Sequence, residues 1–202
     1  LSVCDYNLEK MGTKKNKARH KLLLDVCLAA KFEAESLIPD HEHYVAKYGD
    51  SGSTICTMLA RSFADIGDII RGKDLYLGNP QESTQREKLE DNLKTIFKQI
   101  HSEVTNGKSA EAKERYKGDT DGNYYKLRED WWYANRATIW KAMTCSEKLS
   151  NSSYFRPTCD SSNRQGPSQA NNYCRCDDDQ PGRDNPNTDP PTYFDYVPQY
   201  LR

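Results

Sequence analysis

The sequence has no long apolar run, which excludes a membrane-spanning helix. Its 202 residues are 36% hydrophobic and 29% charged, and no stretch approaches the roughly 18 apolar residues that such a helix needs. A dominant charge of one sign is also missing, because 29 basic residues face 30 acidic ones. With a formal net charge of −1, the chain has no overall field that attracts nucleic acid, so no nucleic-acid partner is expected.

Patterns typical of catalysis and metal binding are absent as well. His41 and His43 lack the i, i+4 spacing of a zinc-protease helix, and there is no glycine-rich phosphate loop. The three aspartates at 177–179 fail as a calcium loop, because Pro181 takes the fifth position and Thr188 stands where a glutamate is required. We therefore expect an exposed acidic loop there, and no enzyme, no catalytic residue, no cofactor and no metal.

Cysteine, in contrast, is abundant, and its distribution predicts a disulfide framework. The seven cysteines lie at positions 4, 27, 56, 145, 159, 174 and 176. This usage is typical of an oxidising compartment, and since seven is odd, at least one cysteine lacks a partner in this sequence. Cys174 and Cys176 are closer than the ligand pairs of zinc sites, so two disulfides leaving in different directions are expected. A local bridge between Cys145 and Cys159 is also predicted.

Apolar periodicity predicts a protein built from long helices. The clearest pattern runs over residues 56–76, where steps of three and four place the apolar residues on one face of a helix about five turns long. Ser53 or Thr54 can cap its start, and Gly72 can end it in the left-handed conformation. Gly67 lies inside this helix, where glycine costs about 1 kcal/mol relative to alanine, and therefore indicates a close helix crossing.

Charged side chains flank this apolar face. Asp65 and Asp68 lie beside it, together with Arg61 and Arg71. At least one of the carboxylates is expected to pair with an arginine at the edge of the core, because a buried charge needs a partner.

Other segments extend the helical pattern and mark where it stops. Three of them share the helical period: residues 17–35, 84–104 and 123–145. Pro39 is expected to interrupt the first, with a polar link over 40–52. Residues 146–190 are rich in Ser, Asn, Asp, Gly and Pro and predict a long irregular region pinned by cysteines. Residues 192–202 are expected to begin a further helix.

Three tryptophans within ten residues allow two interpretations. Trp131, Trp132 and Trp140 could form a binding platform on the surface of their helix. Indole rings at helical spacing are more often core anchors, so the core is the favoured location.

A basic stretch near the start is the candidate binding site. It carries six positive charges and no acid: Lys10, Lys14, Lys15, Lys17, Arg19 and Lys21. Sulfated glycans are polyanions, so binding them requires clustered cations for the same counterion-release reason that governs DNA binding. A solvated, mobile basic loop is the equally weighted alternative.

Four blocks of the sequence resemble, in order, blocks of one protein family. They are CDYNLE from Cys4, ARSFADIGDIIRG from residue 60, WWYANRATIWKAM from Trp131 and PTYFDYVPQYLR at 191–202. These blocks are similar to those of the Duffy-binding-like (DBL) adhesion domains in the erythrocyte membrane protein variant antigens of Plasmodium falciparum. The sequences of these blocks are most similar to the alpha class of these domains, and the blocks span nearly the whole chain.

The resemblance implies an all-α fold, a bundle of long helices with irregular, disulfide-pinned loops. It divides the chain into a loop-rich first subdomain with one helix at 1–52 and a helical second subdomain at 53–202, truncated at its C-terminal end. The family layout pairs Cys56 with Cys174 or Cys176. The family also has a cysteine upstream of the Cys4 block and continues beyond the last block, so both ends of the chain look cut.

The resemblance further implies adhesion. The chain would bind host red-cell surface receptors, such as complement receptor, or sulfated glycans (heparan sulfate, heparin), with blood-group sugars as further candidates. It would act in cytoadherence or rosetting, at the outer face of the infected red cell, in a larger protein whose membrane anchor lies elsewhere. The alternative is a structural or antigenic spacer whose neighbouring domain carries the binding.

Overall fold

Helices dominate the computed structural model, which describes residues 18–49, 54–75, 79–106, 110–119, 121–159, 166–185 and 188–202. The helices are α2 (Ala18–Tyr48), α3 (Ile55–Arg71), α4 (Pro80–Thr105), α5 (Ala110–Arg115) and α6 (Tyr125–Met143). An antiparallel pair of short strands, β1 (Pro157–Cys159) and β2 (Ser168–Gln169), follows. The remaining elements are single 3₁₀ turns: η1 (Glu147–Leu149), η2 (Phe194–Tyr196) and η3 (Gln199–Leu201). The fold is therefore mostly α-helical, as the sequence predicts.

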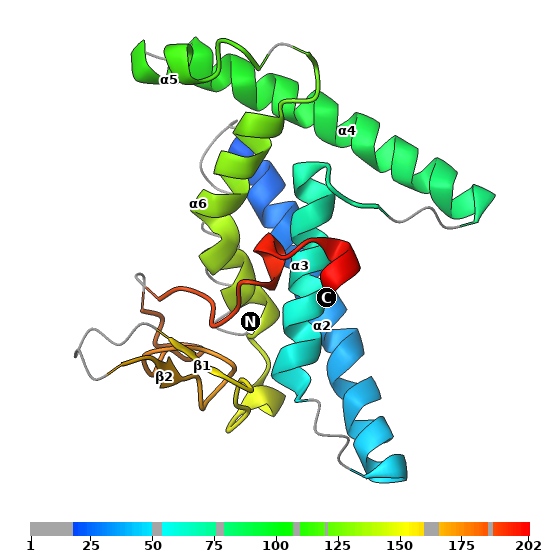
Figure 1. Ribbon diagram of the computed structural model, residues 1–202, viewed down its shortest axis with the longest axis vertical. Helices are drawn as coiled ribbons and strands as arrows, with labels where there is room; N and C mark the ends of the chain where they lie inside the picture. The colour runs from blue at the N-terminus through cyan, green and yellow to red at the C-terminus, as the bar shows by residue number, and fades with distance from the viewer. Residues whose placement is uncertain are drawn as a thin grey trace.

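The long helices form one group (Figure 1). Helices α2, α3 and α6 run side by side, and α4 crosses one end of the group. The irregular region with β1 and β2 lies beside the opposite end of α6, and the C-terminal residues cross the face of α3. No helix in the described ranges is long and apolar enough to cross a membrane.

The ends of α3 follow from local chemistry. The side chain of Thr54 accepts a hydrogen bond from the backbone N–H of Thr57 at 3.3 Å. At the other end Gly72 adopts φ 71°, and its N–H meets the last free carbonyls of the helix. Both predicted caps are confirmed.

The predicted close crossing is confirmed at Gly67. A Cβ atom built on this residue would lie 2.8 Å from Cζ2 of Trp132 and 2.9 Å from its Cε2. Since Trp132 has no exposed surface, the indole fills the space that the glycine leaves. This contact sets how closely α3 and α6 approach.

Aromatic rings form the centre of the core. The ring of Phe63 lies 5.0 Å from that of Trp132 and 5.2 Å from that of Trp140, and Phe97 lies 6.1 Å from Trp131. All three tryptophans are buried. The core interpretation is therefore confirmed, and the tryptophans form no surface platform.

The predicted break at Pro39 is wrong, because α2 continues through this residue to Tyr48. Proline removes one helical hydrogen bond and crowds the preceding turn. Contacts outside the helix offset part of this cost: Ala34 and Ile38 are buried before the proline, and the half-exposed pair of Glu42 with Lys148 at 2.9 Å adds a small contribution after it. Tertiary packing therefore overrides the local signal.

The helix predicted over residues 192–202 is also wrong. The segment forms the two 3₁₀ turns η2 and η3, separated at Pro198, which has no N–H to donate. Its one fully buried acidic side chain, Asp195, bonds to groups on α6 instead of following a helical face. Side-chain contacts rather than a helical ladder hold the segment in place.

Candidate binding surfaces

Between described residues, two disulfides join the irregular region to the helices and to itself. Cys56 of α3 is bonded to Cys174, one of the two partners expected for it, and Cys159 of β1 is bonded to Cys176. The two bonds leave the Cys174–Cys176 pair in different directions, as expected. The predicted Cys145–Cys159 bridge is wrong, since Cys159 has another partner; Cys145 is also disulfide-bonded.

The strand pair explains why Cys159 reaches Cys176. Pairing of β1 with β2 brings Pro157 opposite Gln169, and the N–H of Tyr154 donates to the carbonyl of Ala170 at 2.8 Å. The segment that leads to Cys176 therefore lies beside the strand that contains Cys159. The sequence gives no such signal, because both strands are too short to show alternation.

Cys27 is the free cysteine among the described residues, and it is buried in α2. Burial raises the pKa of its thiol to about 12. The neutral thiol is a weak nucleophile and a poor metal ligand, so Cys27 acts as a small core residue.

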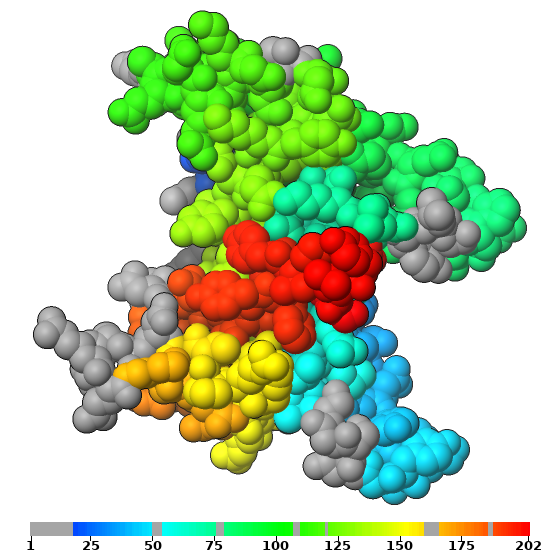
Figure 2. Space-filling model, viewed as in Figure 1, coloured from blue at the N-terminus to red at the C-terminus, as the bar shows by residue number. Residues whose placement is uncertain are grey.

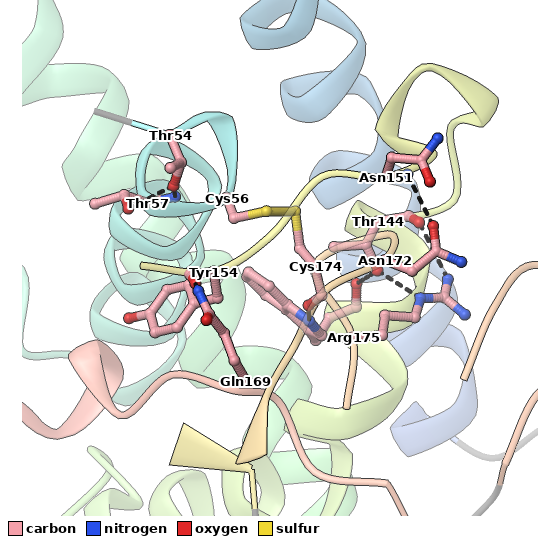
Figure 3. The surroundings of a disulfide bond; sticks show 11 residues. Thr54, Cys56, Thr57, Thr144, Asn151, Tyr154, Gln169, Asn172, Cys174 and Arg175 are labelled. Atoms are coloured by element: carbon pink, nitrogen blue, oxygen red, sulfur yellow. Dashed lines mark hydrogen bonds between the residues drawn. A yellow bond between two sulfur atoms is a disulfide. The ribbon is translucent and has the colours of Figure 1, made fainter. Parts of the chain in front are cut away.

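Arg175 fastens the disulfide-linked loop to the end of α6 (Figure 3). Its Nε donates to the hydroxyl of Thr144 at 2.8 Å, and an Nη donates to the carbonyl of Lys141 at 2.7 Å. The indole N–H of Trp140 donates to the carbonyl of Cys174 at 3.0 Å. Burial lowers the pKa of Arg175, and the nearby Asp179 opposes this shift. The loop is thus positioned by contacts on both sides of its disulfide.

The acidic run at 177–179 is only partly the exposed loop that was predicted. Asp177 and Asp178 are exposed, but Asp179 is buried and lies 3.4 Å from Arg175 and 3.6 Å from Lys141. These two cations balance the charge of buried Asp179: Arg175 lies four residues before it in the same loop, and Lys141 lies on α6. Within the described residues, no group of three or more His, Cys, Asp and Glu side chains could hold a metal ion.

The basic stretch is described only at its end. Lys10, Lys14, Lys15 and Lys17 lie outside the described residues. Arg19 and Lys21 are exposed on the first turns of α2. The N–H of Ala18 donates to the carboxylate of Glu103 at 2.9 Å, which places this turn beside the end of α4. The candidate glycan site stays a prediction.

A buried ionic network that sequence reasoning missed anchors the C-terminal segment. The carboxylate of Asp195 accepts from Nε and Nη2 of Arg136 at 2.8 and 2.9 Å and from the indole N–H of Trp132 at 2.9 Å. Arg71 donates to the backbone carbonyl of Asp195. Burial alone would lower the pKa of Arg136, but the bonds to Asp195 raise it. The only sign of this network in the sequence is a charged residue, Arg136, at a position of α6 that faces the core.

Arg202 extends the network to α3. Its guanidinium pairs with Asp68 and with Asp65, the latter at 2.7 Å. Asp68 also pairs with Arg71 at 2.9 Å, which confirms the predicted carboxylate–arginine pair at the edge of the core. Burial raises the pKa of Asp68, although Arg202 and Arg71 lower it. The last residue described is therefore tied to the helix that organises the core.

Comparisons with known proteins point to one family. The model of the Duffy binding domain family matches residues 1–202. Among solved structures, the NTS-DBL1(alpha-1) domain of PfEMP1 from the Plasmodium falciparum varO strain is 39% identical, with a TM-score of 0.64 over 98% of this chain and 39% of that chain. An ICAM-1-binding DBLbeta domain of PfEMP1 is 32% identical, with a TM-score of 0.59 over 94% of this chain and 36% of that chain.

A third structure agrees, and it shows how much of the relatives is matched. The NTS-DBL1-alpha and CIDR-gamma double domain of PfEMP1 from the same strain is 38% identical, with a TM-score of 0.64 over 96% of this chain and 25% of that chain. The sequence thus spans about two fifths or less of each of these solved chains. No protein with a curated description matches it.

Proposed function

Because the chain belongs to the Duffy-binding domain family, we propose that it is part of an adhesion domain that binds a host receptor on the red-cell surface. The observation that carries this proposal is the family match over the whole chain. The DBL domains of PfEMP1 are adhesion domains and not enzymes. In this proposal the chain acts at the outer face of the infected red cell, within a larger membrane protein, in cytoadherence or rosetting.

The architecture supports such a role. A helical core centred on Phe63 and three tryptophans provides a rigid frame. The irregular region is fixed to this frame by the Cys56–Cys174 disulfide and by Arg175. Binding residues are commonly carried by loops that a rigid scaffold positions, and this chain has both parts.

Sulfated glycans are the partner class that we propose for the basic stretch. Its six cations are Lys10, Lys14, Lys15, Lys17, Arg19 and Lys21. Such a cluster would release the cations condensed on heparan sulfate or heparin, so binding would depend on the salt concentration. Protein receptors and blood-group sugars are the other candidate partners.

Heparin affinity measured against salt concentration tests the glycan proposal. For a site with six cations, we expect binding to weaken by roughly a thousandfold between 50 and 200 mM salt. A variant with Lys14, Lys15, Lys17 and Arg19 changed to Ser should lose most of the affinity and most of the salt slope.

A matched control removes four exposed lysines elsewhere: Lys88, Lys98, Lys113 and Lys117. The control carries the same net charge as the variant, so a specific site predicts heparin binding close to that of the parent. Equal losses in both variants would mean that only net charge matters. If the parent itself does not bind heparin, the glycan proposal fails, and protein receptors, blood-group sugars and the structural or antigenic spacer remain as explanations.

A further inference from the structure

Left-handed backbone concentrates in one loop of the irregular region. Among the described residues, six residues other than glycine have a positive φ, and four of them lie within residues 173–178, which we call the left-handed loop. Their φ angles are 50° for Tyr173, 54° for Cys174, 53° for Asp177 and 55° for Asp178. This conformation brings the Cβ atom close to the following carbonyl oxygen, so each of these residues is strained. Contacts with the rest of the fold must therefore hold the loop in place.

The first half of the left-handed loop is fixed by several contacts besides its disulfide. The N–H of Cys174 donates to the carbonyl of Ser152 at 3.1 Å, and the carbonyl of Cys174 accepts from the indole N–H of Trp140 at 3.0 Å. Its disulfide partner Cys56 lies in the first turn of α3 (Figure 3), and both cysteines are fully buried. If this bond opened, the two thiols would stay side by side. Their effective concentration would remain high, so the bond would re-form readily.

The second half of the loop is supported more weakly. Cys176 is bonded to Cys159, the last residue of the short strand β1, and both residues of the partner strand β2 are exposed. Asp177 and Asp178 are exposed as well, and a turn bond from the N–H of Asp179 to the carbonyl of Cys176 at 3.0 Å spans them. In Figure 2 the irregular region, coloured yellow to orange, lies on the outer surface at one side of the molecule. Local opening of such an exposed segment gives a reductant access to its disulfide.

We propose that the Cys159–Cys176 disulfide is a redox-sensitive latch, which opens while the Cys56–Cys174 disulfide and the helical core stay intact. Opening releases residues 176–178 from their left-handed conformation, because the sulfur of Cys176 no longer holds them against β1. Relief of backbone strain favours the open form, and strained disulfides are the labile ones. The latch goes beyond the proposed adhesive function and does not depend on which partner the chain binds.

The reductant in this step is an external dithiol. One of its thiolates attacks a sulfur of the Cys159–Cys176 bond and forms a mixed disulfide, and the other protein sulfur leaves as a thiolate. The second thiol of the reductant then displaces the remaining protein sulfur and closes a ring. Two electrons and two protons pass to the protein, which gains two thiols, and the dithiol becomes a cyclic disulfide.

Graded mixtures of reduced and oxidised dithiothreitol test the order in which the disulfides open. The chain is equilibrated in each mixture, quenched with acid and alkylated with N-ethylmaleimide. Peptide masses assign each thiol, because trypsin cleaves after Arg175 and so separates Cys174 from Cys176. Tryptophan fluorescence reports in parallel on the helical core. We expect Cys159–Cys176 to be half-reduced at a dithiol-to-disulfide ratio at least about tenfold lower than Cys56–Cys174, with no change in fluorescence.

Two double variants test whether the backbone of the loop relaxes when the latch opens. Asp177→Gly with Asp178→Gly relieves the left-handed strain. Asp177→Ala with Asp178→Ala increases it, because alanine lacks the short polar side chain by which aspartate tolerates this region. Both variants lose the same two exposed charges, so their net charge is matched. We expect half-reduction of Cys159–Cys176 to need a dithiol ratio at least about tenfold higher in the glycine variant than in the alanine variant.

Opening of the two disulfides at the same ratio, or opening of Cys56–Cys174 first, would overturn the latch. A fluorescence change that accompanies reduction of Cys159–Cys176 would overturn it too, because the helical core would then not stay intact. Equal ratios for the glycine and alanine variants would show that residues 176–178 keep their conformation after reduction, and the release of this segment would be wrong.

Discussion

At the scale of single residues, buried arginines connect separate elements of the fold. Arg128 has no exposed surface; its Nε donates to the carbonyl of Ile70 at 2.6 Å, and its Nη atoms pair with Glu90. It therefore meets the free carbonyls at the end of α3 and ties them to α4. Arginine suits such sites because its planar fork offers five donors in a fixed geometry. Each of these residues connects elements that are distant in sequence.

The first prediction concerns the substitution of Gly67. Changing Gly67 to Ala would improve helix propensity by about 1 kcal/mol, but the added methyl would overlap the indole of Trp132, which is fully buried. We expect a net loss of about 1–3 kcal/mol in the free energy of unfolding, measured by denaturant titration.

The matched control for this prediction is Gly118→Ala. A Cβ atom at Gly118 would meet nothing within 4 Å, so its effect on the free energy of unfolding should stay within about 0.5 kcal/mol. Equal stability of the Gly67 variant and the parent would show that moving α3 and α6 apart costs no more than the roughly 1 kcal/mol gained in helix propensity.

At the scale of elements, the C-terminal segment is held by its side chains and not by regular secondary structure. Its two 3₁₀ turns supply few backbone bonds. The segment is ordered by contacts of Asp195 with α6 and of Arg202 with α3. Such an element should depend strongly on one or two buried groups.

Asp195→Asn tests this dependence. The substitution removes the charge that faces Arg136 and leaves a buried guanidinium without its counterion. Breaking a buried pair in this way costs about 3–5 kcal/mol, and hydrogen exchange of residues 193–202 should become faster.

The control for the network is Asp65→Asn. The Asp65 side chain is 54% exposed, and its partner Arg202 keeps a second pair with Asp68, so the loss of the Asp65 charge should cost less than about 1 kcal/mol. Equal effects of the two substitutions on stability and exchange would show that the buried network does not anchor the segment.

For the whole molecule, the described residues share one core. Helix α2 contacts α3, α4 and α6, and the buried cluster runs from Leu22 through Trp132 to Cys176. The division into subdomains at 1–52 and 53–202 stays a prediction. Because the core is continuous, the two parts should not unfold independently.

Alkylation of Cys27 measures this coupling. At pH 8 the native thiol should not react with iodoacetamide, since burial raises its pKa from the ordinary cysteine value to about 12. The raised pKa of this thiol makes the free energy of unfolding depend on pH. Its contribution is fully present below pH 9 and is lost as pH rises from 9 towards 12, because the thiol of the unfolded chain ionises first.

Reaction of Cys27 in increasing denaturant should follow the same transition as tryptophan fluorescence, which reports on α6. Coincident curves are the expected result for one cooperative unit. Alkylation that precedes the fluorescence change would instead show that α2 detaches while the rest of the core remains folded.

The sequence by itself determined the local features, because these depend on neighbouring residues. The caps at Thr54 and Gly72, the close approach at Gly67 and the buried tryptophans were all predictable. Helical periodicity located α3, α4 and α6, since packing against a core selects residues every three or four positions. The resemblance of four ordered blocks indicated the family.

Only the tertiary structure decided the features that join distant residues. Helix α2 passes Pro39 because its neighbours Ala34 and Ile38 are packed in the core. Cys159 bonds to Cys176 because two short strands align them. Asp195 meets Arg136 across 59 positions, and a separation of that length leaves no periodic trace in the sequence. Local patterns record the neighbours of a residue along the chain, and only the folded chain shows its neighbours in space.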